Sequence, residues 1–135
     1  MDLKILLTIG VMLALLIVRA QAIKCYFCNT LDNNECWQNP PPAKFLVDCS
    51  KLAGGENFTI CRRMTRLYSD QGVKATPNKD NTSLERHCAV ARNDSSPCMK
   101  TWLTLPAMRL EITGNACTCT TNDCNGAEIT LDSKA

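Results

Sequence analysis

The chain has 135 residues and a formal net charge of +2, and it contains ten cysteines but only two Trp, two Tyr and three Phe residues. This length predicts one domain, and so few aromatic side chains predict a small hydrophobic core. The weak charge and the lack of a run of basic residues argue against a nucleic-acid partner. The high cysteine content is atypical of a cytosolic enzyme.

Residues 1–22 have the features of a secretory signal peptide. Lys4 supplies a positive charge, Ile5–Val18 is a 14-residue apolar stretch, and Ala20-Gln21-Ala22 matches a cleavage site. A membrane anchor would need roughly 20 apolar residues. We therefore expect a mature chain that begins at Ile23 and has no transmembrane segment.

Cysteines are spread over the rest of the chain, and their number is even. They are Cys25, Cys28, Cys36, Cys49, Cys61, Cys88, Cys98, Cys117, Cys119 and Cys124. An even number behind a secretory signal predicts five disulfides, because thiols are oxidised in the secretory route. Spacing alone does not select one pairing.

The first two cysteines form a Cys-x-x-Cys motif that has two other interpretations. A redox dithiol needs a strand–helix context, but no helical periodicity of apolar residues follows Cys28. A zinc site would use paired motifs of this kind, and only one is present. We therefore expect structural disulfides, with no metal and no cofactor.

The stretch from Cys28 to Cys49 predicts a turn followed by a stiff connector. Leu31–Glu35 is rich in turn-forming residues, and Pro40–Pro42 is incompatible with a central strand. The three prolines also fit an extended recognition element. A connector is the more common role of such a triplet.

The stretch from Cys61 to Cys88 predicts a long hairpin. Phe58–Tyr68 is rich in β-branched and aromatic residues and predicts its rising strand. Ser69–Ser83 contains Gly, Pro, Asn and Asp residues and predicts its tip, and Leu84–Val90 predicts the returning strand.

The stretch from Cys98 to Cys117 predicts a further hairpin. Met108–Thr113 alternates apolar and polar residues, as a strand with one solvent-exposed face does. We expect Pro106 to mark the tip and Gly114 the end of this strand. The chain has no internal repeat, so we expect one domain rather than two copies.

Residues 127–135 form a polar C-terminal tail. A lipid-anchor signal requires a hydrophobic tail of about 10–20 residues, which this segment lacks. We therefore expect a secreted, extracellular protein with no evident lipid anchor.

Positive charge is concentrated in the second hairpin. Its basic residues are Arg62, Arg63, Arg66, Lys74, Lys79 and Arg86, and its acidic residues are Asp70, Asp80 and Glu85. An ordinary solvated strand face would give this pattern. Complementarity to an acidic partner would give it too, and we keep the first five basic residues as candidate partner-binding residues.

Apolar residues surround the predicted tip of the third hairpin. Because the fold has little interior, we expect Trp102 to pack against the second hairpin and Leu105 and Met108 to be more exposed. All three are candidate partner-binding residues, since an aromatic side chain beside aliphatic ones is a common interface anchor.

Three sites match the N-glycosylation pattern, at Asn57, Asn81 and Asn93. We expect good access at Asn81, which lies in the turn-rich tip. A glycan there would cover one side of the second hairpin's tip.

The cysteine motifs resemble those of the Ly-6/uPAR (lymphocyte antigen-6/urokinase receptor) family. The resemblance rests on Cys25-Tyr26-Phe27-Cys28 and on the ending Cys117-Thr118-Cys119-Thr120-Thr121-Asn122-Asp123-Cys124-Asn125-Gly126. It implies an all-β, disulfide-rich, three-finger fold like that of snake toxins, with the domain at residues 23–126. Thr118 separates two cysteines that are adjacent in vertebrate members, which looks like the arthropod branch. The lack of a hydrophobic anchor tail is a second difference from the family pattern.

The resemblance also implies the disulfide pairing. The implied bridges are Cys25–Cys61, Cys28–Cys36, Cys49–Cys88, Cys98–Cys117 and Cys119–Cys124. Each would stabilise the fold by about 2–4 kcal/mol, which a chain with a thin core needs.

No pattern in the sequence indicates an enzyme. The only histidine, His87, is adjacent to a cysteine assigned to a bridge, and no phosphate-binding loop or hydrolase motif is present. We therefore expect a binding module rather than an enzyme.

The resemblance implies two functions for such a module. The first is a modulator that docks on the extracellular domain of a receptor or ion channel, as toxin-like relatives do at nicotinic acetylcholine receptors. The second is an assembly factor, since arthropod relatives are associated with septate junctions and trafficking of membrane proteins. Lys74 and Lys79 suit a receptor-binding tip, whereas a glycan at Asn81 and the lack of aromatic residues there favour contact over a broad face. A third possible function, inhibition of a secreted enzyme, is supported only by analogy of fold.

Overall fold

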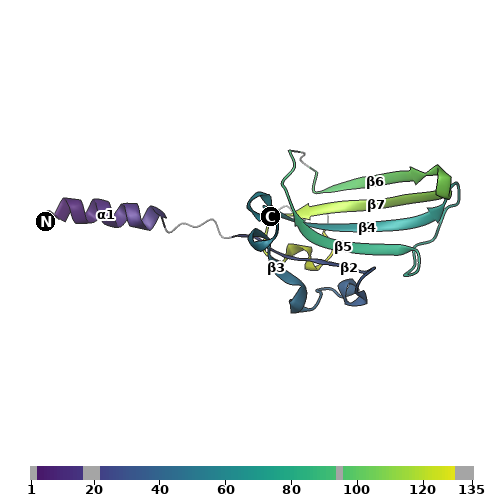
Figure 1. Cartoon of the computed structure of the whole chain (residues 1–135), viewed down its shortest axis with the longest axis horizontal. Coiled ribbons are helices and arrows are strands. Elements are labelled where there is room, and N and C mark those ends of the chain that lie inside the picture. Colours follow the sequence, from purple (N-terminus) through teal and green to yellow (C-terminus); the bar gives the residue numbers. More distant parts are fainter. Residues whose placement is uncertain (1–2, 17–21, 94–95, 130–135) are drawn as a thin grey trace.

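The computed structural model describes residues 3–16, 22–93 and 96–129 (Figure 1). Helix α1 (Leu3–Leu16) lies within the predicted signal peptide. Among the described residues, no helix is both long enough and apolar enough to cross a membrane. Residues 20 and 21 of the predicted cleavage site, residues 94 and 95 of the third sequon and residues 130–135 of the predicted tail lie outside the described residues.

The rest of the described chain consists of antiparallel strands joined by loops and short 3-10 helices. The strands are β1 (Lys24–Tyr26), β2 (Cys28–Asn29), β3 (Leu46–Asp48), β4 (Ile60–Asp70), β5 (Thr82–Ala89), β6 (Cys98–Leu105) and β7 (Leu110–Cys119). β1 pairs with β3, and the other strands form a five-stranded sheet in the order β2-β5-β4-β7-β6 (Figure 1). The second hairpin is β4–β5, and the third is β6–β7. β4 lies at the centre of the sheet, paired on both sides.

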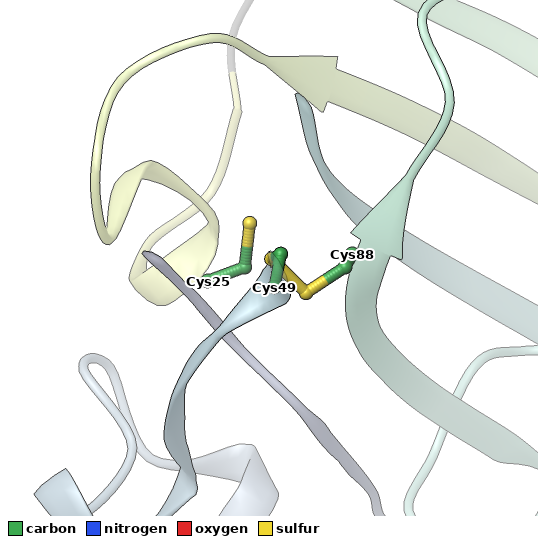
Figure 2. Close-up of side chains that lie close together, drawn as sticks. All are labelled: Cys25, Cys49 and Cys88. Atoms are coloured by element: carbon green, nitrogen blue, oxygen red, sulfur yellow. A yellow bond between two sulfur atoms is a disulfide. The ribbon is translucent and has the colours of Figure 1, made fainter. Parts of the chain in front are cut away.

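Sulfur atoms form the core of this domain. All ten cysteines are in disulfides, and the structure has the five pairs that the resemblance implies. The buried cluster consists of Cys25, Cys49, Cys61 and Cys88, with the half-buried side chains of Ile23, Val47, Leu52 and Phe58 packed against it. Figure 2 shows Cys25 beside the Cys49–Cys88 bridge. The domain thus has few large apolar side chains in its centre and depends on covalent links.

Asn125 closes the domain by linking three segments that are distant in sequence. Its side chain is fully buried. Its Oδ1 accepts a hydrogen bond from the backbone N–H of Tyr26 at 2.9 Å, and its Nδ2 donates to the carbonyls of Tyr26 and Arg62 at 3.0 Å. These bonds satisfy backbone groups of β1 and β4 that lie away from water.

Arg86 is a second buried polar residue. The sequence counted it among the basic residues of the second hairpin's surface, and the structure shows that it is not on the surface. Its side chain is fully buried in β5, so its charge does not contribute to the surface of the hairpin. The guanidinium donates to the carbonyls of Cys36, Gln38 and Asn125 and to the side chain of Asn39. These acceptors come from the first loop and the C-terminal loop, which Arg86 thereby holds against the sheet.

Strand boundaries differ from the sequence-based prediction in both hairpins. β4 begins and ends two residues later than expected, and β7 continues five residues beyond Gly114. Gly114 was expected to end the strand, but it lies inside it. A Cβ atom at this position would overlap the carbonyl oxygen of Thr65 in β4, so the glycine allows close approach of two backbones instead of a turn.

The role of Asn125 gives a testable prediction for stability. Asn125→Ala leaves the buried N–H and carbonyl of Tyr26 without partners, and each such group costs about 1–3 kcal/mol; it also removes one hydrogen bond to the half-buried carbonyl of Arg62. We expect the free energy of unfolding to fall by at least about 3 kcal/mol. Urea denaturation with the disulfides intact measures this change.

Asn122→Ala in the same loop is the matched control. Asn122 is exposed and makes one hydrogen bond, from the backbone N–H of Lys24 at 2.9 Å. Its loss is expected to cost about 1 kcal/mol or less. Equal losses in the two variants would contradict the role assigned to Asn125.

Candidate binding surface

The five-stranded sheet has two faces, because successive side chains of a strand point to opposite sides. We call one the Arg62 face and the other the Trp102 face. Strand alternation and register place Arg62, Met64, Arg66, Glu85, His87, Met99 and Leu103 on the Arg62 face. The same criteria place Arg63, Thr65, Leu67, Lys100, Trp102 and Thr113 on the Trp102 face.

Arg62 and Arg66 lie together on the Arg62 face, but one of them already has a partner. Arg66 Nη1 is 2.9 Å from Glu85 Oε2, and Glu85 Oε1 is 3.8 Å from His87 Nδ1. This half-exposed ion pair contributes at most about 1 kcal/mol to stability. It does, however, partly neutralise Arg66, which reduces the charge that this face offers to an acidic partner.

Arg63 lies on the opposite face from the other two arginines of β4. Burial lowers the pKa of its guanidinium, and the nearby Glu128 carboxylate raises it. Its Nε is buried and has no hydrogen-bond partner within the described part of the chain. The arginines that the sequence grouped together therefore do not form one basic patch.

The ends of the second and third hairpins lie side by side at one end of the sheet (Figure 1). The backbone N–H of Gln71 donates to the carbonyl of Arg109 at 2.7 Å, which joins the two ends directly. Arg109 has a left-handed backbone with φ of 52°, because it ends the short turn Pro106–Met108.

We call the exposed basic residues and the exposed large apolar residues of these two turns the paired hairpin ends. They are Val73, Lys74, Lys79, Met108 and Arg109. The second hairpin's turn also carries the exposed Asp80. Met108 is 72% exposed and Val73 is 58% exposed. The sequence predicted Lys74, Lys79 and Met108 as contact residues, but not Val73 or Arg109. An apolar residue within an otherwise polar loop was the available signal for Val73.

Trp102 is exposed, so the prediction that it packs against the second hairpin is wrong. Its side chain is 70% exposed, and Nε1 donates to Glu111 Oε1 at 2.9 Å. β6 is an edge strand of the sheet, and β7 separates it from the second hairpin. The residue opposite Trp102 is Thr113, which is too small to cover an indole ring. Leu105, expected to be exposed, is half-buried.

The Trp102 face carries a groove of about 670 Å³. Trp37 of the first loop and Trp102 both line it, and its other lining residues include Leu67, Pro77 and Lys100. A groove with these side chains offers apolar contacts to a partner. The structure therefore places candidate contact residues on both faces and at the hairpin ends.

The cysteines of the core do not form a thiolate site. The sulfur atoms of Cys25, Cys49 and Cys88 lie within 4.8 Å of one another (Figure 2). All three are bonded to other sulfur atoms, and a metal ligand has to be a free thiolate. This cluster is therefore the covalent core described above.

The three glycosylation sites differ in their surroundings. Asn57 and Asn93 are exposed, whereas Asn81 is half-buried. Asn81 Nδ2, the atom that would carry a glycan, donates to the carbonyl of Thr76 at 3.1 Å, and Oδ1 accepts from the N–H of Asn78 at 2.8 Å. Access at Asn81 is thus lower than the turn-rich sequence suggests, and glycosylation stays a prediction.

Comparison with known proteins assigns the domain to a family. A family model described as the Quiver family u-PAR/Ly-6-like domain matches residues 23–125. A search of curated proteins gave no significant match. The matched region covers all seven strands and all ten cysteines.

The surroundings of His87 predict a pH dependence of stability. Burial lowers its pKa, Glu85 raises it, and Arg62 and Arg66 lower it further, so the net shift is below the ordinary value of 6.5. As the pH falls through 6.5, His87 therefore becomes protonated more readily in the unfolded chain than in the folded one. The free energy of unfolding is highest above pH 6.5 and decreases at lower pH.

Since His87 is the only histidine, His87→Gln should flatten this dependence. We expect the free energy of unfolding of the wild type to fall between pH 7 and about pH 5, and that of the variant to change less. Denaturation across this range measures both slopes. Equal slopes would show that His87 is not responsible.

Proposed function

The chain belongs to the Quiver family of u-PAR/Ly-6-like domains, and from this we propose that it is a secreted module that docks on and modulates the extracellular domain of a membrane receptor, ion channel or cell-junction protein. Domains of this type have the three-finger fold and are non-enzymatic binding modules, so the predictions of fold class and of a non-enzyme are confirmed. Such proteins modulate receptors and channels. A disulfide-rich domain of this family is extracellular, where disulfides persist.

The paired hairpin ends are the observation that supports docking most directly. The two turns carry the exposed apolar side chains Val73 and Met108 and the exposed cations Lys74, Lys79 and Arg109, which outnumber the exposed carboxylates of Asp70 and Asp80. Apolar side chains buried at an interface supply affinity, and cations around them accelerate association with an acidic surface. This combination fits an ectodomain that presents an apolar patch with acidic residues around it.

The sheet supports these ends rigidly. β4 is paired over eight residues with β5 and over ten with β7, and the disulfide cluster lies at the opposite end of the same strands. A contact surface that is already ordered loses little conformational entropy on binding. The basic side chains of β4 support the proposal less, because Arg66 is paired with Glu85 and Arg63 is half-buried.

An assembly role in cell junctions or in trafficking of membrane proteins is the second candidate. It is favoured by the exposed apolar side chains of β6, which are Met99, Trp102 and Leu103. These lie along the side of the sheet rather than at the hairpin ends. A partner that lies along the domain would use them.

A pair of double variants tests the docking surface. In Val73→Ser/Met108→Ser the hairpin ends lose both exposed apolar side chains, and the cations remain. Burying one such side chain fully is worth about 1.5–3 kcal/mol, so we expect binding to intact tissue at least about tenfold weaker. Binding of the labelled protein and proximity labelling of its neighbours measure the change.

Leu31→Ser/Val90→Ser is the control, because both residues are exposed and apolar but lie outside the hairpin ends. It should label the same membrane protein as the wild type does. If both double variants label that protein equally, docking by the hairpin ends is wrong. If labelling falls only in Met99→Ser/Leu103→Ser, the lateral contact of the second candidate is supported instead.

A further inference from the structure

Strand β6 forms an open edge of the five-stranded sheet. It pairs with β7 on one side and is the last strand of the sheet on the other (Figure 1). The edge of a sheet carries backbone N–H and C=O groups that no strand pairs with, and another extended chain binds readily to it. The properties of β6 therefore decide whether a partner is excluded or accepted there.

The register identifies which backbone groups of β6 point outward. The N–H of Thr118 donates to the carbonyl of Pro97, which lies opposite it, at 2.7 Å. Hydrogen-bonded pairs alternate along an antiparallel ladder, so Met99, Thr101 and Leu103 also bond to β7. The N–H and C=O groups of Lys100, Trp102 and Thr104 consequently point away from the sheet. They form a row of donors and acceptors in which every second residue supplies one N–H and one C=O.

This edge has few of the features that usually block strand pairing. No proline or glycine lies within Cys98–Leu105, and Lys100 is its only charged residue. Trp102 and Leu103 are 70% and 52% exposed, on opposite faces of the strand. Proteins usually protect edge strands with prolines, charges or bulges. An unprotected edge with large apolar side chains on both faces is expected to bind another strand.

We propose that the partner at this edge is a second copy of the same chain, whose β6 pairs antiparallel with β6 and joins the two sheets into one. A two-fold axis at Trp102 places the two Trp102 residues opposite each other. It also places Lys100 of each copy opposite Thr104 of the other. All the residues so paired have outward-pointing backbone groups, and two facing aromatic side chains add to the stability of a strand pair.

Charge complementarity specifies a second copy in this register. Glu111 of β7 lies opposite Thr104, so Lys100 of the second copy falls in the same row as Glu111 and on the same face. The two positions are two strand spacings apart, about 10 Å between backbones, which a lysine and a glutamate side chain span together. Two such pairs, one on each side of the axis, would flank the two tryptophans.

The pair between Lys100 and Glu111 forms only between copies. Within one chain, Lys100 lies opposite Asn115, four residues along β7 from Glu111. Lys100 has no ion pair within the part of the chain that the structure describes, and Glu111 accepts from Trp102 Nε1 with one oxygen only. A register shifted by two residues would place Lys100 opposite Trp102 of the second copy, away from Glu111. Dimerisation thus uses charges that a single copy leaves unpaired.

Charge exchange between the two positions tests the dimer. The secreted full chain should sediment as a dimer at micromolar concentration. Lys100→Glu and Glu111→Lys each place like charges together and should weaken dimerisation at least about tenfold. The double variant Lys100→Glu/Glu111→Lys restores opposite charges and should dimerise again. An equimolar mixture of the two single variants should form heterodimers, because each then supplies the charge that the other lacks.

Lys74→Glu is the matched control, because it makes the same charge change at the hairpin ends and should leave the dimer intact. Intact mass and circular dichroism verify that every variant has five disulfides and the native fold. A wild type that sediments as a monomer at all concentrations overturns the proposal. The proposed register is wrong if the folded Lys100→Glu/Glu111→Lys variant and the mixture of the two single variants both stay monomeric. Val73→Ser/Met108→Ser should remain dimeric, so this result is independent of the docking surface proposed above.

Discussion

The disulfide cluster at one end of the sheet is the constraint on which the rest of the structure depends. Cys25–Cys61 joins β1 to the central strand β4, and Cys49–Cys88 joins the end of β3 to β5. Apart from these sulfur atoms, the buried apolar side chains are few, and Leu84 is the largest of them that is fully buried. Burial of so little apolar area could not by itself offset the conformational entropy of the chain. The disulfides reduce the conformational entropy of the unfolded chain, so less entropy is lost on folding. The hairpins can therefore extend far from the core.

Buried polar groups stabilise the loops that the disulfides connect. Arg86 has no carboxylate partner in the described residues, and all four of its acceptors are neutral oxygen atoms. Burial, and then the neighbouring Arg63, lower its pKa to about 10, so it remains charged at neutral pH. Because amides and carbonyls do not titrate, this contact is insensitive to pH across the physiological range. It holds the first loop and the loop around Asn125 in the positions that the disulfides allow.

The sequence predicted the fold class well but the surface poorly, for physical reasons. The cysteine motifs at the two ends of the domain are local features that resemble those of one family, and this resemblance implied the fold class. The positions of Arg86 and Trp102 depend instead on strand order, because a basic residue is buried only where distant loops supply carbonyls. Trp102 is likewise exposed because β6 lies at an edge of the sheet, where the second hairpin does not reach it. Gly114 shows the same limit, since a glycine that ends a strand and one that lets two backbones approach look alike in sequence.

The hydrogen bond between Gln71 and Arg109 makes the turns of the second and third hairpins a single mechanical unit. A substitution that changes the length or backbone path of one turn will also displace the other, even when the two share no side-chain contact. Variation in the recognition properties of such domains is then expected to arise from coordinated change in both turns. Anyone who transplants a specificity loop between related domains would need to transfer both hairpins together.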